Sequence, residues 1–231
     1  GVVFSLVLFL LQEPQRKGAG ANQNVPLREV IAFLKTNRKT VLLHNLGFAC
    51  LAFSSYGAGA WIPEFFVRSY GMHRVQVGEI LGWITMVGGS LGIVSGGLLA
   101  DFLLKKGMRD APMRVGVLAA LLTLPMQLGY LAPEPFWAIL CNAIAVFALA
   151  MPFGVAPAAL QEIMPNPMRG QASALYLFVV TLIGLGVGPT AVALITDFVF
   201  QDDAALRYSL LIVGVCATLL AALLLGLSLS P

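Results

Sequence analysis

Apolar segments long enough to cross a lipid bilayer recur along this chain. Six of them lie near residues 40–67, 75–104, 112–132, 135–164, 168–199 and 205–229. A membrane-spanning helix needs about 20 residues at 1.5 Å each, and these segments are too long and too free of alternation for barrel strands. Charged residues make up only 11% of the chain, against roughly a quarter in soluble domains. The sequence therefore predicts an all-α polytopic membrane protein with a six-helix transmembrane bundle over residues 40–231.

Two shorter segments precede the bundle. Residues 1–11, GVVFSLVLFLL, are apolar but too short to span, and they lack the basic start of a signal peptide. We interpret them as the end of a truncated transmembrane helix. Residues 12–39 form a polar linker, and within it VPLREVIAFLKTNRK predicts a short amphipathic helix with Leu27, Val30, Ile31 and Leu34 on one side. Such a helix lies either on the membrane surface or against protein.

The distribution of Lys and Arg predicts the orientation in the membrane. If the linker is cytoplasmic, only Arg68, Arg74 and Arg207 of the 14 basic residues lie outside. Cytoplasmic loops are enriched in these residues, so we expect the linker and the C-terminus in the cytoplasm. The short loops favour a bacterial inner-membrane protein. The net charge of +3 follows from topology and does not indicate a nucleic-acid partner.

The residue types needed for metal binding or catalysis are sparse. The three cysteines, Cys50, Cys141 and Cys216, lie in apolar segments without CxxC spacing, so neither a disulfide framework nor a zinc site is indicated. The two histidines, His44 and His73, fall on opposite sides of the predicted membrane. We therefore expect no metal, no cofactor and no enzymatic activity.

A glycine stripe marks the second span. Gly88, Gly92 and Gly96 recur every fourth residue, so they share one helix face and allow a neighbouring backbone to approach closely. The span then ends in Asp101, Lys105 and Lys106. Small residues followed by a charged helix end indicate a tightly packed helix whose terminus carries an electrostatic contact.

The stretch GGLLADFLLKKG (96–107) resembles the loop signature of the major facilitator superfamily. The resemblance implies a twelve-helix fold of which this chain is the C-terminal half, built from two inverted three-helix repeats. It also implies a missing N-terminal six-helix half, where the family's coupling acid is expected. YGAGAWIPEFFVRSYGM (56–72) and LQEIMPNPMRGQASALY (160–176) are similar to the Spinster-like subgroup, which is associated with lysolipids and sphingosine phosphate.

Charged residues cluster where two helices end on the cytoplasmic side. Asp101 and Lys105 end one helix, Glu162 ends another, and Arg169 opens the next. A carboxylate–guanidinium cluster among them would hold the helices together when the cytoplasmic side is closed. The alternative is a role in topology and folding alone.

The spans also carry aromatic and polar side chains suited to a substrate cavity. The resemblance implies that the first and fourth helices of the half line the central path and that the second and fifth help to close it. On these helices we expect the cavity residues Phe48, Phe53, Tyr56, Trp61, Asn142, Phe147, Phe153, Tyr176 and Thr181. For any single aromatic residue the alternative is helix packing. As a group they indicate an amphipathic substrate.

Two ionisable residues lie within the first full span. His44, one turn from its cytoplasmic start, could accept a proton near neutral pH. Glu64, near the outer end, either lines the outer mouth or pairs with Arg68 four residues on. Both are candidates for proton coupling, because ionisable groups at membrane depth need a partner or a function.

The function predicted from these features is secondary active or facilitative transport by alternating access. The expected substrate is amphipathic and lipid-like, such as a lysolipid, and transport is coupled to protons or uncoupled. The alternatives are an organic-anion or drug exporter of the same superfamily and, outside transport, a membrane scaffold or receptor. The expected partners are membrane lipids, the substrate, protons and the missing half.

Overall fold

The structure, a computed structural model, describes residues 26–229, except for the side chains of Leu27, Glu162 and Ile163. Those residues contain six helices long and apolar enough to cross a membrane, which confirms the prediction: Arg38–Tyr70, Arg74–Lys105, Ala111–Leu131, Pro135–Gln161, Asn166–Phe200 and Asp203–Gly226. Each span begins and ends within a few residues of its predicted position. The predicted truncated helix at residues 1–11 and most of the linker lie outside the described residues.

Several spans consist of more than one helical element. The first span is the single helix α3 (Arg38–Tyr70). The third is α6 (Ala111–Met126) followed by the 3-10 helix η3 (Gln127–Leu131), and the sixth is the 3-10 helix η7 (Asp203–Ala205) followed by α11 (Leu206–Gly226). The second span consists of α4 (Arg74–Trp83), η2 (Ile84–Gly89) and α5 (Ser90–Lys105). The fourth consists of α7 (Pro135–Ala150) and α8 (Pro152–Ile163). The fifth consists of η4 (Asn166–Met168), α9 (Arg169–Thr181), η5 (Leu182–Val187), α10 (Gly188–Leu194) and η6 (Ile195–Phe200).

Glycines in the left-handed conformation end two of the spans. Gly71 has a φ of 66° and follows α3, and Gly107 has a φ of 86° and follows α5. The Gly107 amide donates to the Leu104 carbonyl at 2.9 Å and the Met108 amide to the Leu103 carbonyl at 3.1 Å. These bonds satisfy carbonyls that the helix end leaves open, a C-terminal cap for which glycine is the preferred residue.

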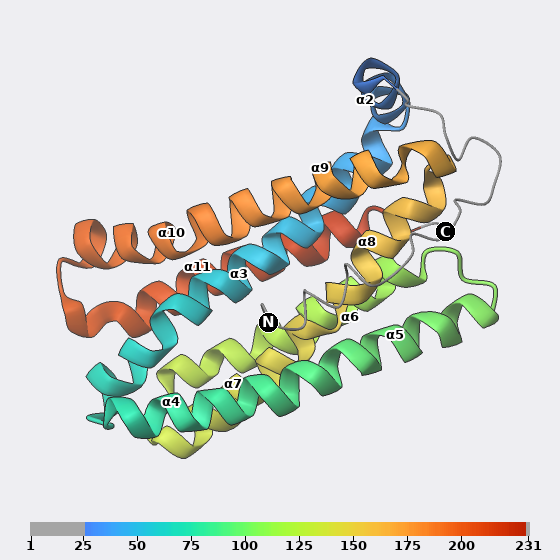
Figure 1. The fold of residues 1–231 in the computed structure, drawn as a ribbon. Coiled ribbons are helices and arrows are strands. Elements are labelled where there is room, and N and C mark those ends of the chain that lie inside the picture. The colour runs from blue at the N-terminus through green and yellow to red at the C-terminus, as the bar shows by residue number, and fades with distance from the viewer. Residues whose placement is uncertain (1–25, 230–231) are drawn as a thin grey trace, which may run out of the picture.

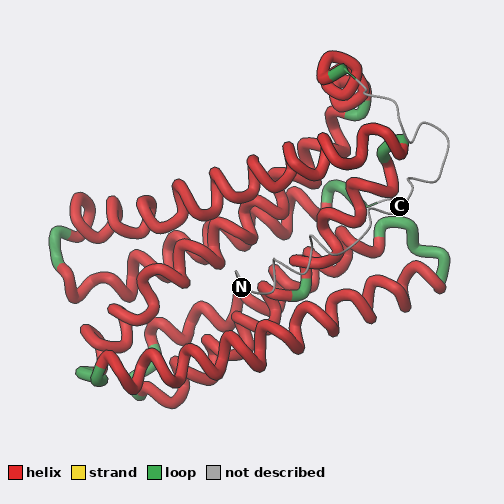
Figure 2. The backbone as a smooth tube through the Cα atoms, in the orientation of Figure 1, coloured by secondary structure: helices red, strands yellow, loops and turns green. Residues whose placement is uncertain are grey.

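The spans run side by side in one bundle (Figure 1). α9 and α10 lie along one edge, α4 and α5 lie along the other, and α3 runs between them. α3 packs on α11 and on the span formed by α9, η5 and α10, whereas α7 packs on α6, η2 and α5. The loops gather at the two ends (Figure 2). We call the end that carries α2 (Leu27–Thr36) and the α5–α6 loop the α2 end, and the other the opposite end.

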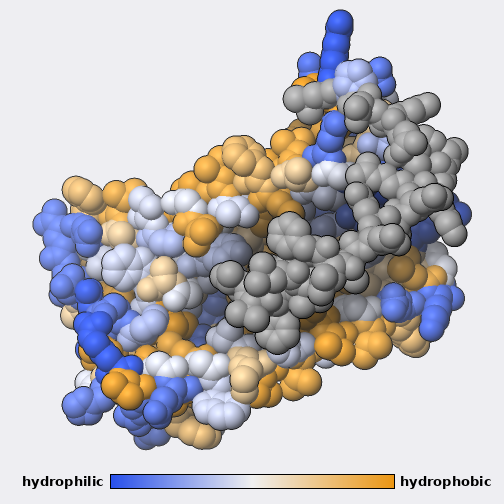
Figure 3. Space-filling model, viewed as in Figure 1, coloured by the Kyte–Doolittle hydropathy of each residue, from blue (hydrophilic) through white to orange (hydrophobic). Residues whose placement is uncertain are grey.

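The sides of the bundle carry apolar side chains, as a lipid-facing surface requires. On α5, Leu91, Val94, Leu98 and Phe102 are all more than half exposed and follow one another at helical spacing. Figure 3 shows hydrophobic residues along the sides and hydrophilic residues gathered at the two ends. A water-soluble protein rarely exposes so large an apolar surface, so this distribution supports a transmembrane orientation.

The glycine stripe packs α5 directly against the backbone of the fourth span. A Cβ atom added at Gly92 would overlap the carbonyl of Phe147, and one added at Gly96 would overlap the backbone of Met151. Met151 separates α7 from α8, where Pro152 cannot donate a backbone hydrogen bond. The predicted close helix approach is thus present, and it faces a break in the neighbouring helix.

A second glycine contact mirrors the first. In the fifth span, a Cβ atom at Gly184 would overlap Tyr56 and Ala52 of α3, and one at Gly188 would meet the Phe53 carbonyl. The second span thus packs on the fourth and the fifth on the first, which is the exchange expected from two three-helix repeats. Both glycine-bearing spans also contain a π-helical segment near their middle, η2 and η5. Gly184, Gly186 and Gly188 do not interrupt the fifth helix, which widens into η5 and continues as α10.

Candidate functional site

A pocket of about 1050 Å³ opens among the first four spans. Its walls come from α3, from the second span, from α6 and from α7 and α8, with Leu185 of η5 at one edge. Polar side chains line it at Ser54, Ser55, Tyr56, Thr85, Ser90, Thr123, Gln127, Tyr130 and Asn142. Among the described residues that line the pocket, none is Asp, Glu, Lys, Arg or His. A large apolar cavity with scattered hydrogen-bonding groups is typical of small-molecule sites.

Three of the nine predicted cavity residues line this pocket: Tyr56, Asn142 and Phe153. Asn142 supplies an amide that can both donate and accept hydrogen bonds. Phe153 remains about half exposed, at 54%, on the first turn of α8. The three come from the first and fourth spans, the pair that the resemblance places beside the central path.

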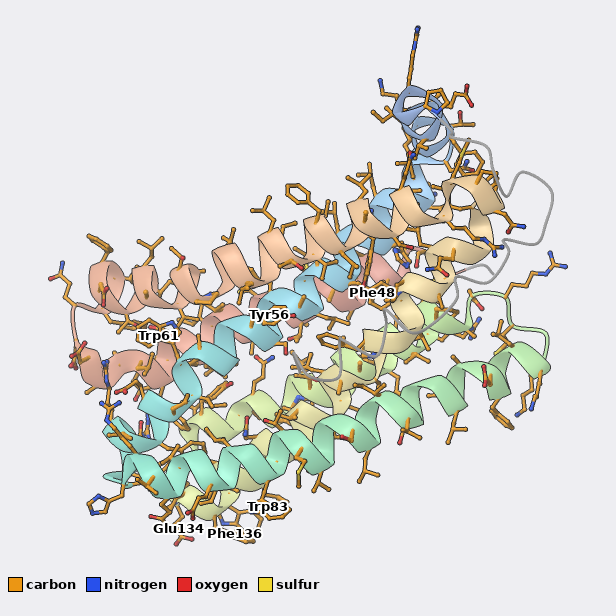
Figure 4. The ribbon with its side chains drawn as sticks, viewed as in Figure 1. Phe48, Tyr56, Trp61, Trp83, Glu134 and Phe136 are labelled. Atoms are coloured by element: carbon orange, nitrogen blue, oxygen red, sulfur yellow. The ribbon has the colours of Figure 1, made fainter. Side chains whose placement is uncertain are left out.

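The other six predicted cavity residues lie elsewhere. Phe48 and Tyr176 are buried in a core cluster toward the α2 end. Phe53 and Trp61 pack against a second core cluster toward the opposite end, and the Trp61 indole donates to the Pro189 carbonyl at 2.9 Å. Figure 4 shows Phe48, Tyr56 and Trp61 spaced along α3. For these four residues, helix packing describes the observed contacts. The remaining two are Phe147, which packs beside Met151, and Thr181, which is exposed.

The third span contributes lining residues that sequence reasoning left out. Thr123 and Gln127 are buried and line the pocket, although the family arrangement assigns that role to other spans. Gln127 Nε2 donates to Thr218 Oγ1 at 3.2 Å. Its Oε1 is the one buried side-chain oxygen without a hydrogen-bond partner among the residues that the structure describes. A glutamine inside an apolar segment was the signal that could have identified this position.

His44 joins three spans near the α2 end. The ring is fully buried, its Nε2 lies 3.0 Å from the Ala156 carbonyl of α8, and its Nδ1 lies 3.0 Å from Asn45 Oδ1. It also contacts the rings of Phe48 and, on α9, Tyr176. A carbonyl only accepts, so Nε2 carries a proton and donates it to Ala156.

Glu64 belongs to an ion-pair network at the opposite end. Its carboxylate pairs with Arg68 at 3.5 Å, as one of the two sequence interpretations expects, and also with Arg74 at the start of α4. Arg68 reaches on to Asp203 at 3.3 Å, ahead of α11. The network therefore connects the ends of the first, second and sixth spans. Sequence spacing indicated only the Glu64–Arg68 pair, because the other partners are distant in the chain.

The predicted charge cluster at the α2 end is not assembled from its described members. Asp101 and Lys105 are exposed, and Arg169 Nε donates to the Met164 carbonyl at 3.3 Å. The side chain of Glu162 lies outside the described residues. At this end Asp110 holds Arg114 through two contacts of 2.9 and 3.1 Å. Asp110 and Arg114 open the third span, so their pair fixes the start of that helix.

Comparison with known proteins identifies the family. A profile of the Major Facilitator Superfamily matches residues 1–189. An MFS-type efflux pump of Mycolicibacterium smegmatis is 28% identical over 170 residues, which cover 73% of this chain and 39% of the pump. A cis,cis-muconate transport protein of Acinetobacter baylyi is 28% identical over 138 residues, which cover 60% of this chain and 32% of that protein. The chain therefore spans well under half the length of these curated relatives.

The fold agrees with the sequence match. A crystal structure of a bacterial homolog to the human lysosomal transporter Spinster, in an inward-facing and occupied conformation, aligns with a TM-score of 0.65. The alignment covers 98% of this chain and 55% of that one at 20% identity, so it shows a shared fold. Six membrane-spanning helices, glycine contacts exchanged between two three-helix units and a profile match over most of the sequence converge on one assignment. The chain belongs to the major facilitator superfamily.

Proposed function

We propose that this chain forms half of a secondary transporter that works by alternating access and carries an amphipathic, lipid-like substrate such as a lysolipid. The observation that carries the proposal is the pocket of about 1050 Å³, whose described lining residues carry no formal charge and come from both three-helix units. A pocket of this composition suits an acyl chain or ring system together with a few neutral hydrogen-bonding groups. Any charged group of the substrate would then contact the missing half.

The packing around the pocket supports movement between two states. Glycine contacts bring backbones together without interlocking side chains, so one helix can shift along another with little repacking. π-helical segments frequently occur at functional sites, and η2 and η5 occupy matching places in the second and fifth spans. The break at Met151 gives the fourth span a further point of bending.

Flux measurements on the intact transporter in liposomes test this proposal. Labelled lysophosphatidylcholine should cross the membrane of liposomes that contain the wild-type transporter. Asn142→Leu should raise the KM about twofold to thirteenfold, the effect of one lost hydrogen bond of about 0.5–1.5 kcal/mol. Thr181→Val is the matched control, because Thr181 is exposed and does not line the pocket. Absence of lysolipid flux, or an effect of Thr181→Val that exceeds that of Asn142→Leu, would contradict the proposal.

Organic-anion or drug export is the second candidate. The efflux pump and the muconate transporter named above support it, because each is 28% identical to this sequence over the matched residues, whereas the Spinster homolog is 20% identical. In that case the anion's charge would bind outside this uncharged pocket. The same liposomes distinguish the two candidates: flux of cis,cis-muconate without lysolipid flux would assign the anion class and leave the fold unchanged.

Proton coupling belongs to the same proposal, with Glu64 and His44 as its candidates. Protonation of Glu64 would neutralise the carboxylate that holds Arg68 and Arg74, and would so release the ends of the first two spans. Flux in Glu64→Gln and His44→Gln should then lose its dependence on an imposed pH gradient. Flux that is independent of the gradient in wild type would instead indicate facilitated transport.

We further propose a bacterial inner-membrane location with the α2 end in the cytoplasm, supported by the cations gathered there. In intact cells, a membrane-impermeant maleimide should label Asp202→Cys and leave Arg109→Cys unlabelled until the cells are opened. The reverse pattern would invert the orientation.

A further inference from the structure

Helix α2 presents two different faces. Val30 is buried to 1% exposure, and Phe33 and Leu34 pack against the core cluster at the α2 end. On the other side, Arg28, Ile31 and Lys35 follow at spacings of three and four residues, so they form one exposed line along the helix. The prediction that Ile31 shares the packed side with Val30 and Leu34 is therefore wrong, because the buried side of α2 is narrower than the apolar pattern indicated. α2 thus packs against the bundle with one face, and its other face exposes a line of a cation, an apolar residue and a cation (Arg28, Ile31 and Lys35).

The cations of this region have no partner within the protein as described. Arg28, Lys35, Arg38 and Lys39 are all exposed, and none of them forms an ion pair with a residue whose side chain the structure describes. The only acidic residue in the same stretch is Glu29. An unneutralised group of cations attracts an anionic surface, provided that the surface lies within about a Debye length of 10 Å.

The position of α2 provides that surface. In Figure 1 α2 is seen almost end-on while the spans run across the view, so α2 does not run along the spans but across their direction, as a helix lying along the membrane surface would. α2 lies against the side of the bundle and does not project past the ends of the spans. Figure 3 shows hydrophilic residues on α2 next to hydrophobic ones. Helices with this placement rest at the headgroup level, where Lys and Arg extend their charges toward the headgroups.

We propose that the exposed line of α2 binds the anionic phospholipid headgroups of the leaflet at the α2 end, with Arg28 and Lys35 contacting phosphates and Ile31 inserted between the acyl chains. Each cation near an anionic membrane surface raises the affinity for that surface about fivefold. Two cations on one face should therefore favour an anionic over a zwitterionic headgroup by roughly 25-fold.

Lipid-dependent quenching at α2 in the intact transporter tests the proposal. Ala32 is exposed beside the line, so Ala32→Cys, in a background with Ala at the three native cysteines, carries a fluorophore. The detergent-solubilised protein is titrated with brominated phosphatidylglycerol and with brominated phosphatidylcholine. Wild type should bind the anionic lipid about 25-fold more tightly, and this preference should decrease as salt is added.

Matched variants separate the helix from general charge. Arg28→Gln with Lys35→Gln should abolish the preference, whereas the exchange Arg28→Lys with Lys35→Arg should retain it. Lys106→Gln with Arg109→Gln removes two cations that are also exposed, from the α5–α6 loop at the same end, and it should leave the preference unchanged. Equal quenching by both lipids in wild type, or a preference that survives the double Gln variant, would overturn the proposal. Quenching by neither lipid would also overturn it, because the missing half would then cover α2.

Discussion

The contact between α5 and the fourth span predicts a large difference between two neighbouring glycines. A Cβ atom at Gly96 would lie 2.7 Å from the backbone Cα and carbonyl carbon of Met151, where ordinary contacts are 3.4–4 Å. Backbone atoms cannot rotate away, so the two helices would have to separate by about 1 Å, and overpacking of this kind costs about 1–3 kcal/mol. At Gly97 an added Cβ meets no atom within 4 Å. We therefore expect Gly96→Ala to destabilise the bundle, whereas Gly97→Ala keeps or slightly raises stability through its better helix propensity.

Thermal unfolding of the solubilised intact transporter measures this difference. A thiol-reactive dye reports unfolding through Cys50 and Cys141, which are partly buried in the folded bundle. Gly96→Ala should unfold at a clearly lower temperature than wild type, and Gly97→Ala should not. If both variants unfold at the same temperature, the close approach of α5 to Met151 is not what holds these two spans together, and the assignment of the glycine stripe to helix packing is refuted.

Three further substitutions test individual contacts. Trp61→Phe removes the hydrogen bond to Pro189 and should cost about 0.5–1.5 kcal/mol in the same unfolding assay; an unchanged unfolding temperature would show that the bond adds no stability. His44→Phe keeps an aromatic ring but removes the buried hydrogen bond to α8, so it should destabilise by about 1–3 kcal/mol and release the ends of the first and fourth spans, as seen in distances between spin labels. Arg68→Gln removes the cation that links Glu64 to Asp203 near the surface. It should change stability by less than about 1 kcal/mol, and the difference should shrink at high salt. A larger loss that does not depend on salt would contradict the interpretation of this network as a surface feature.

Local features of the sequence predicted the fold well. Span number, span limits and the glycine stripe depend on residues close together in the chain, where hydropathy and helical periodicity are sufficient guides. Gly92 and Gly96 contact a neighbouring backbone, as their four-residue spacing indicated. The family resemblance of residues 96–107 rested on the same kind of local pattern, and the superfamily match agrees with it.

The candidate site was predicted less completely. Tyr56, Asn142 and Phe153 line the pocket, but Phe48 and Tyr176 pack in the core. The spans are apolar on every side, so periodicity does not distinguish the side that faces lipid from the side that faces a cavity. An aromatic residue is suited to either environment, and the sequence pattern around it does not decide between them.

What the sequence alone determined is a set of local properties: a membrane protein of six spans, the positions of these spans and the places where glycine allows a close helix approach. The tertiary structure decided which side of each helix meets which neighbour. It brought Gln127 of the third span into the pocket, joined His44 to α8 and connected Glu64 to Arg74 and, through Arg68, to Asp203. Each of these contacts joins different spans, and no spacing along one helix encodes the rotation and depth of its neighbour.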